Sequence, residues 1–247
     1  MSGAETGPTR AMVLAAGFGR RMRPITEKMP KTLVAPGGRS LLDRALDRLE
    51  AAGVEQVVVN LHHLGERIEA HLEERASPPV VFSPEAELLE TGGGVKAALP
   101  LLGEEAFFVV NGDTLWLDGL VPALDRMAAA WDAAVMDALL LLHPTAYALT
   151  YQGAGDFFLS PEGRVRRRGE REVAPFVFAG VQILHPRLFA EAPEGAFSLN
   201  RLYDQAAEAE RLWGVRHDGE WFEVGTPEAL RLAEDALHYL DSYAVHR

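Results

Sequence analysis

Residues 13–32 read VLAAGFGRRMRPITEKMPKT, and this stretch decides how the fold is interpreted. An apolar run that is typical of a buried strand is followed by two glycines, Gly17 and Gly19, and then by basic residues. The cations of the stretch are Arg20, Arg21, Arg23, Lys28 and Lys31. Glycine lets backbone N–H groups approach an anion closely, and arginine binds phosphate oxygens with a fixed fork of donors. The stretch therefore predicts a phosphate-binding loop directly after a strand, with a basic surface loop as the alternative.

The two common phosphate-binding motifs do not describe this loop. The dinucleotide pattern G-x-G-x-x-G needs a third glycine where Met22 stands, and no G-x-x-x-x-G-K-[ST] motif occurs in the chain. A dinucleotide-dependent dehydrogenase is therefore disfavoured.

The composition is that of an ordinary globular protein without nucleic-acid or membrane partners. Acidic residues outnumber basic ones 36 to 24, and the net charge of −12 argues against a nucleic-acid backbone as the main partner. The most apolar stretch, residues 133–142, is interrupted by Asp137 and is too short to span a membrane. The absence of cysteine excludes disulfides and thiol catalysis and fits a cytoplasmic protein. Residues 1–9 have no apolar core, so we expect a disordered lead-in and no secretory signal.

Apolar runs alternate with helical patterns in the first half of the chain. Strands are predicted at 11–16, 56–60, 79–83 and 106–113, and helices at 40–53, 64–75, 91–102 and 118–130. Such alternation is typical of a parallel sheet that is covered by helices on both faces. Ligands bind at the carboxyl ends of such strands, so the loops after Ala16 and Val110 are expected to face the site.

The second half is more mixed, with no linker that would mark a second domain. Strands are predicted at 132–143, 156–160, 174–185 and 220–225, and helices at 197–210 and 226–240. The charge run RVRRRGERE (164–172) is interpreted as a solvated hairpin turn.

Two carboxylates are candidates for a magnesium site. Asp113 closes the sequence NGD (111–113) at the end of an apolar strand, and Glu223 lies within the apolar segment WFEVGT (221–226). Carboxylate oxygens suit Mg²⁺, so the pair predicts a two-carboxylate clamp. The alternatives are an ordinary Asn-Gly-Asp turn and a glutamate that points to solvent.

The loop resembles the signature of the sugar-1-phosphate nucleotidyltransferases, G-x-G-x-R-x-x-P-x-T followed by P-K. The matching residues are Gly17, Gly19, Arg21, Pro24, Thr26, Pro30 and Lys31. The resemblance covers nearly the whole chain through ETGGG (90–94), NGD, FAG (178–180) and WFEVGT. Within the family, the sequences M-R-P, S-P-E, L-E-T-G-G-G and G-D-F are most similar to the short N-acetylmuramate-1-phosphate uridylyltransferases of cell-wall sugar recycling.

The resemblance implies a three-layer αβα, Rossmann-like α/β nucleotidyltransferase fold with a mostly parallel central sheet. It implies one domain, residues 10–247, with a nucleotide-binding half at about 10–130, a sugar-binding half at about 131–226 and a C-terminal helix at 227–243. It also implies Mg²⁺-dependent transfer from UTP to a sugar 1-phosphate, which gives a UDP-sugar and pyrophosphate. A monomer or small homo-oligomer is expected.

The resemblance also assigns roles to individual residues. Arg21 would hold the triphosphate and the leaving pyrophosphate, Lys31 would neutralise the phosphoryl group under attack, and Asp113 with Glu223 would hold Mg²⁺. The other residues assigned to the nucleotide are Leu14, Ala15, Gly17, Gly19, Gly92, Gly93 and Asn111, and those assigned to the sugar are Asp156 and Gly180. The run of glycines at 92–94 favours a ligand lying against the backbone there.

The chain departs from the family pattern at two points. Glu223 stands where relatives usually have aspartate, and the Glu-Lys-Pro triplet whose lysine grips the sugar phosphate is missing. The arginines at 166–168 or Arg171 could replace that lysine, or they form a solvated charge run. The alternatives left open are a guanylyltransferase for mannose or heptose 1-phosphate and a non-catalytic nucleotide sensor.

Four other conspicuous residues carry weaker hypotheses. His62, His63 and His71 lack partners at metal-ligand spacing and are interpreted as surface or loop residues. Trp116 is interpreted either as a wall of the sugar pocket or as ordinary packing.

Overall fold

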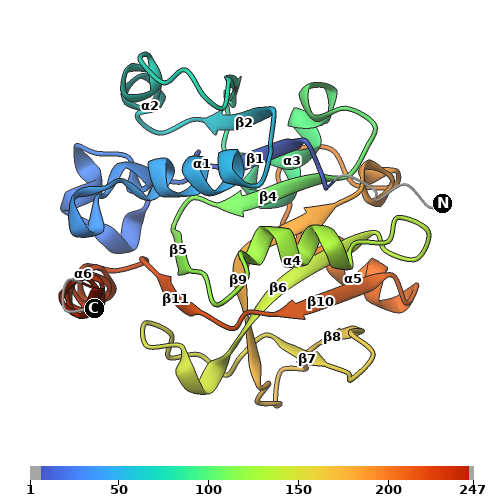
Figure 1. Ribbon diagram of the computed structural model, residues 1–247. Coiled ribbons are helices and arrows are strands. Elements are labelled where there is room, and N and C mark those ends of the chain that lie inside the picture. Colours follow the sequence, from blue (N-terminus) through green and yellow to red (C-terminus); the bar gives the residue numbers. More distant parts are fainter. Residues whose placement is uncertain (1–6, 245–247) are drawn as a thin grey trace.

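The central feature of the fold is one mixed, mostly parallel sheet (Figure 1). The computed structural model describes residues 7–244, so the predicted lead-in lies mostly outside the described residues. The main path of the sheet runs β10-β6-β9-β4-β1-β2-β3, and β9 alone on this path is antiparallel to its neighbours. These strands are β1 (Arg10–Leu14), β2 (Gln56–Leu61), β3 (Val80–Pro84), β4 (Phe107–Asn111), β6 (Ala138–Pro144), β9 (Phe176–Leu184) and β10 (Leu212–Arg216).

Helices cover both faces of the sheet, which confirms the predicted three-layer α/β fold. Successive residues of β1 point to opposite faces: Val13 packs in the cluster that holds α1, α2 and α4, whereas Met12 packs with α3 and α5. The helices are α1 (Leu41–Ala51), α2 (Gly65–Leu72), α3 (Glu90–Leu102), α4 (Ala123–Ala130), α5 (Asn200–Glu208) and α6 (Pro227–Ala244). Among the residues described, no helix is long and apolar enough to cross a membrane.

Local signals in the sequence fix several helix ends. The side chain of Ser40 accepts a hydrogen bond from the backbone N–H of Asp43 at 2.9 Å and caps α1. Gly53 follows that helix with φ of 81°, a conformation that favours glycine. α6 begins at Pro227, directly after Thr226, whose side chain accepts a hydrogen bond from the N–H of Ala229 at 3.1 Å.

A third apolar cluster joins α6 to the glycine loop. It contains Met22 from the loop, Leu115 and Phe222 from a small two-stranded sheet, and Ala233 from α6. The small sheet pairs β5 (Thr114–Leu117) with β11 (Glu220–Glu223) in antiparallel fashion. The loop itself contains four single 3-10 turns, at Arg20–Met22, Ile25–Glu27, Lys31–Leu33 and Pro36–Gly38, and two more occur at Thr145–Tyr147 and Pro186–Phe189.

Several predicted boundaries were wrong. The strand expected at 132–143 begins only at Ala138, because Asp132 accepts the N–H of Ala134 in a preceding turn. The helix expected at 118–130 begins at Ala123, after Pro122. The expected solvated hairpin at 164–172 contains a strand, β8 (Val165–Arg167), which pairs with β7 (Phe157–Leu159) beside β9.

A buried histidine lies beneath β11. His143 on β6 is 2% exposed, and its ring centroid lies 5.8 Å from those of His217 and Trp221. Burial, with the nearby His217, lowers the pKa of His143 to about 4. Burial likewise lowers the pKa of His217. Between about pH 4 and about pH 6.5, His143 is therefore protonated in the unfolded chain and neutral in the folded chain.

We expect the free energy of unfolding to fall as the pH drops from about 6.5 to about 4, with His143 contributing on the order of 2–3 kcal/mol. Urea unfolding of the wild type and of His143→Gln across this range measures the effect. The difference between the two proteins should change with pH by that amount. His238→Gln, at an exposed position, is the control, and a pH-independent difference for His143→Gln would contradict the prediction.

Candidate active site

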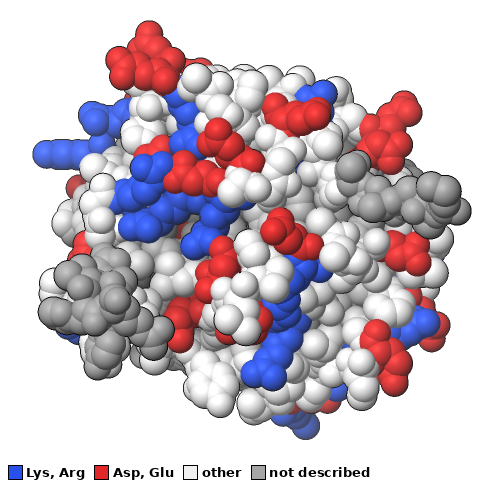
Figure 2. All heavy atoms as spheres, viewed as in Figure 1, with Lys and Arg blue, Asp and Glu red and all other residues white. Residues whose placement is uncertain are grey.

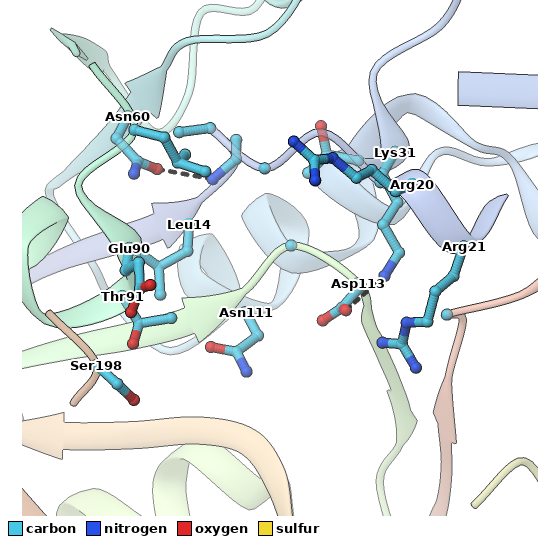
Figure 3. A pocket seen from close by; sticks show the side chains of 18 residues that line it. Leu14, Arg20, Arg21, Lys31, Asn60, Glu90, Thr91, Asn111, Asp113 and Ser198 are labelled. Carbon is cyan, nitrogen blue, oxygen red and sulfur yellow. Dashed lines mark hydrogen bonds and ion pairs between the residues drawn. The ribbon is translucent and has the colours of Figure 1, made fainter. Parts of the chain in front are cut away.

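A cavity of about 510 Å³ opens at the carboxyl ends of β1 and β4 (Figure 3), where the sequence predicted a site. Figure 2 shows basic side chains gathered over the loop that follows β1, although the chain as a whole is acidic. The residues that line the cavity are Leu14, Ala15, Ala16, Gly17, Gly19, Arg20, Arg21, Lys31, Thr32, Asn60, Leu88, Glu90, Thr91, Asn111, Gly112, Asp113, Ser198 and Gly225. Eight residues predicted to bind nucleotide or metal are therefore brought together here: Leu14, Ala15, Gly17, Gly19, Arg21, Lys31, Asn111 and Asp113.

Two ion pairs lie at this cavity, and one of them joins the lining residue Arg21 to Glu223, which is not itself a lining residue. The Nζ of Lys31 lies 2.6 Å from Oδ2 of Asp113, and Nη2 of Arg21 lies 2.8 Å from Oε1 of Glu223. The hydrogen bond that Arg21 donates to the Glu223 carboxylate raises the pKa of Arg21. The Lys31 side chain is 14% exposed and that of Arg21 is 66% exposed, so Lys31 is fixed whereas Arg21 has room to move.

Pairing between β5 and β11 sets the relative position of the two carboxylates. The N–H of Val224 donates to the carbonyl oxygen of Asp113 at 2.9 Å, next to the ladder that pairs Glu223 with Thr114. Asp113 and Glu223, which are distant in the sequence, therefore lie at the same end of one short antiparallel sheet.

The local structure requires glycine at position 19, which also lines the cavity. Its φ is 58°, and a Cβ at this position would lie 2.9 Å from the Thr26 side chain and 3.1 Å from Cβ of Lys31. The hydroxyl of Thr26 donates to the carbonyl oxygen of Gly19 at 2.8 Å. The glycine and threonine of the signature thus close the loop on itself and place Lys31.

The sequence reasoning missed the importance of Gly112. Its N–H donates to the carbonyl oxygen of Leu14 at 3.0 Å, and a Cβ there would overlap that oxygen and the Thr32 side chain. The Asn-Gly-Asp turn is therefore pressed against the end of β1, which brings Asp113 to the glycine loop.

Asn60 and Glu85 were also missed. Oδ1 of Asn60 accepts the N–H of Ala15 at 2.7 Å, and Nδ2 donates to Oε1 of Glu85 at 2.6 Å. The other Glu85 oxygen accepts the N–H of Leu89 at 2.9 Å. This buried network fixes the end of β1 relative to the segment before α3. A polar Asn60 at the end of an apolar strand is the signal in the sequence that could have revealed it.

Gly92 and Gly93 do not line the cavity. Their N–H groups donate to the carbonyl oxygen of Phe197 at 2.8 and 3.2 Å, and a Cβ on Gly92 or Gly93 would overlap Phe197 or Gly195. The glycines are thus explained by packing against residues 195–197, and the neighbouring Thr91 lines the cavity in their place. Nucleotide contact by Gly92 and Gly93 stays a prediction.

A second cavity, of about 760 Å³, adjoins the first and shares Thr91, Asn111 and Ser198 with it. Its lining residues are Thr91, Asn111, Asp156, Phe157, Arg167, Arg168, Gly169, Glu170, Phe178, Ser198, Leu199, Asn200 and Tyr203. Of the two predicted sugar-binding residues, Asp156 lines it. Oδ2 of Asp156 accepts the N–H of Phe178 at 2.9 Å.

Gly180 lies where β9 passes β5 and lines neither of these two cavities. Its φ is 76°, and a Cβ there would lie 3.0 Å from Oγ1 of Thr114. This close approach between strands explains why position 180 is a glycine. Contact between Gly180 and the sugar stays a prediction.

Four residues whose roles were only weakly predicted lie outside both cavities, namely Trp116, His62, His63 and His71. Trp116 is buried, with the Arg48 guanidinium 5.0 Å from its ring centroid. His62 and His63 lie within hydrogen-bonding distance of backbone oxygens, and His71 pairs with Asp43 at 2.9 Å. Within residues 7–244 no group of three or more histidine or carboxylate side chains is placed to hold a metal.

Comparison with known proteins agrees with this geometry. Residues 11–218 match the MobA-like NTP transferase domain. The N-acetylmuramate alpha-1-phosphate uridylyltransferase of Caulobacter vibrioides is 46% identical over 235 residues, which cover 93% of this chain and 97% of that protein. The protein of the same name from Neisseria meningitidis serogroup B is 35% identical, with 91% of this chain and 96% of its own length covered.

Solved structures show the same fold at low sequence identity. UDP-glucose pyrophosphorylase complexed with UDP-glucose superposes with a TM-score of 0.78 at 18% identity, over 94% of this chain and 98% of that one. HddC from Yersinia pseudotuberculosis complexed with GMP-PN gives a TM-score of 0.73 at 20% identity, over 93% and 99%. The chain therefore belongs to the MobA-like NTP transferase family, which confirms the nucleotidyltransferase resemblance carried by the glycine loop.

Proposed function

We propose that the chain transfers the uridylyl group of UTP to N-acetylmuramic acid 1-phosphate, giving the UDP-sugar and pyrophosphate. The observation that carries this proposal is the cluster of Arg21, Lys31 and Asp113, with Glu223 paired to Arg21, at a cavity that adjoins a second one. Such a site accepts a triphosphate and a second phosphorylated ligand side by side. The names of the two relatives supply the base and the sugar. We place the reaction in the cytoplasm, which a chain without cysteine permits.

The reaction needs no covalent enzyme intermediate. An oxygen of the sugar phosphate attacks the α-phosphorus of UTP and forms a new P–O bond, while the bond to the oxygen bridging the β-phosphate breaks. Pyrophosphate leaves with the electron pair of that bond. Catalysis then consists of positioning and of neutralising charge on the phosphoryl oxygens.

The cavity residues divide this work. Lys31 is rigidly placed and faces the phosphoryl group under attack, whereas the more exposed Arg21 follows the leaving pyrophosphate. The backbone at Ala15 and Gly17 lines the nucleotide, with Ala15 held in place by Asn60. The second cavity takes the sugar.

Asp113 and Glu223 would hold Mg²⁺. Mg²⁺ is commonly bound by one or two carboxylates together with waters and substrate phosphates, so this donor set fits it. When bound, the ion supplies positive charge to the reacting phosphates. Each carboxylate is paired with a cation in the structure, so metal binding requires that Lys31 and Arg21 exchange carboxylate for phosphate partners.

Guanylyl transfer is the alternative within the same fold. The mannose-1-phosphate guanyltransferase of Yarrowia lipolytica is 27% identical over 89% of this chain but over only 61% of its own length. A non-catalytic nucleotide sensor is the alternative of another class, and Glu223 in place of aspartate is the feature that suggests it.

A substrate panel tests the proposed function. Pyrophosphate release is measured with Mg²⁺, four nucleoside triphosphates and a set of sugar 1-phosphates. We expect the highest kcat/KM with UTP and N-acetylmuramic acid 1-phosphate. A preference for GTP and mannose 1-phosphate would replace the proposal with the guanylyltransferase. Nucleotide binding without release from any pair would support the sensor.

Arg21→Ala should lower kcat by about 10²–10³-fold, because the cation acts on charge that develops in the transition state. Single-turnover kinetics at saturating UTP measure the chemical step. Arg39→Ala is the control, since Arg39 pairs with Asp47 outside the cavity. Near-normal turnover in Arg21→Ala would remove the residue from the catalytic site.

Glu223→Gln should raise the Mg²⁺ concentration needed for half-maximal activity, because a charged ligand is lost. It should also free Arg21, so the metal-free protein should bind pyrophosphate roughly two- to fivefold more tightly. Magnesium titration and calorimetry without metal measure the two effects. Glu220→Gln on the same strand is the control. An unchanged magnesium titration would exclude Glu223 from the metal site.

A further inference from the structure

The charge run at 164–168 contains four arginines, and three of them have acidic partners. Arg164 lies 3.0 Å from Glu210. Arg166 binds Glu172 through two nitrogens at 2.7 and 3.1 Å. Arg167 binds Asp204 through Nε, at 2.7 Å, and Nη2. Arg168 differs, because it forms no ion pair with any residue of the described chain.

Backbone carbonyls hold the Arg168 side chain in place. Its Nε donates to the carbonyl oxygen of Gly155 at 2.6 Å, and its Nη1 donates to that of Gly169 at 3.2 Å, with two longer bonds to neighbouring carbonyls. Nη2 makes no hydrogen bond within residues 7–244. The guanidinium is thus oriented by neutral groups while its charge is left without a counterion. Such a group binds an anion with little further loss of side-chain freedom.

Arg168 lines the second cavity and not the first. Arg167 also lines it, but Asp204 already neutralises that residue. The carboxylate of Asp156 accepts the N–H of Phe178 and the hydroxyl of Tyr151. The cavity assigned to the sugar therefore presents one oriented cation that lacks an acidic partner.

The position of Arg168 separates it from the phosphate chemistry. Lys31 and Asp113, which face the reacting phosphates, line only the first cavity. Arg168 directly follows β8, and Figure 1 shows the β7–β8 hairpin far below the loop between β1 and α1. An anion at Arg168 is therefore expected on the body of the sugar and not on its 1-phosphate. N-acetylmuramic acid has such an anion, the carboxylate of its lactyl ether.

We infer that Arg168 is the specificity-determining residue that binds the lactyl carboxylate of N-acetylmuramic acid 1-phosphate, an inference that rests on the proposed function. N-acetylglucosamine 1-phosphate has the same ring and phosphate but no lactyl group. Arg168 therefore contributes to the use of the first sugar phosphate and not to that of the second.

The test compares kcat/KM for these two sugar phosphates, with UTP, in the wild type, Arg168→Gln and Arg168→Lys. Loss of one charged hydrogen-bonding group predicts a drop of about 10- to 100-fold for the lactyl sugar in Arg168→Gln. The value for N-acetylglucosamine 1-phosphate should stay within about twofold, and Arg168→Lys should recover part of the loss. Arg164→Gln, in the same charge run but outside the cavity, should change neither value.

Binding provides a readout that is independent of turnover. Calorimetry with UDP-N-acetylmuramic acid and UDP-N-acetylglucosamine should show that Arg168→Gln weakens binding of the first nucleotide sugar only. Melting temperatures identify a variant that does not fold, in which case Arg168→Lys decides the result.

The outcomes separate the inference from the proposed function. If both sugar phosphates lose activity equally, Arg168 grips the phosphate or supports the fold, and the inference is overturned. If Arg168→Gln keeps the wild-type preference for the lactyl sugar, the inference fails while the proposed function stands. A wild type without that preference contradicts the proposed function, and the inference falls with it.

Discussion

The pairing of β5 with β11 is the interaction on which the rest of the site depends. It places Glu223 beside the end of β4 and thereby beside Asp113, through the hydrogen bond from Val224 to the Asp113 carbonyl. The indole of Trp221 anchors β11 with bonds of 2.9 Å to Thr114 and to the carbonyl oxygen of Ala179. The strands β5 and β11 are only four residues long. Their pairing joins the segment that precedes α6 to the segment that follows β4.

Four of the charged side chains at the first cavity compensate one another in pairs. Lys31 with Asp113 and Arg21 with Glu223 form two pairs whose net charge is zero. A cluster of unpaired cations at this place would repel itself and destabilise the loop. The mutual pairs keep these cations close together, and in the proposed reaction substrate phosphates would replace the carboxylates as their partners.

The sequence predicted the elements that depend on nearby residues and missed those that depend on distant ones. The helices expected at 40–53, 64–75 and 91–102 correspond to α1, α2 and α3, because the apolar pattern of each lies within one short segment. The short strands β5 and β10 are defined by partners far away in the chain, β11 and β6, so periodicity alone could not identify them.

The same limit explains how the site residues were interpreted. The sequence predicted a ligand contact for the glycines at 92–94. The structure shows residues 195–197 packed on Gly92 and Gly93, a contact that the sequence near residue 92 cannot reveal. Arg168 was indistinguishable from its neighbours until the structure showed which of them have acidic partners.

The three residues shared by the two cavities, Thr91, Asn111 and Ser198, have a consequence for inhibition. The two cavities adjoin at these residues, so a single molecule that reaches past them would occupy both. A uridine nucleotide tethered to an acidic sugar mimic would make its second contact intramolecularly, at a high effective concentration set by a short linker. Such a bisubstrate compound would combine the affinities of both halves without requiring either half to bind tightly alone.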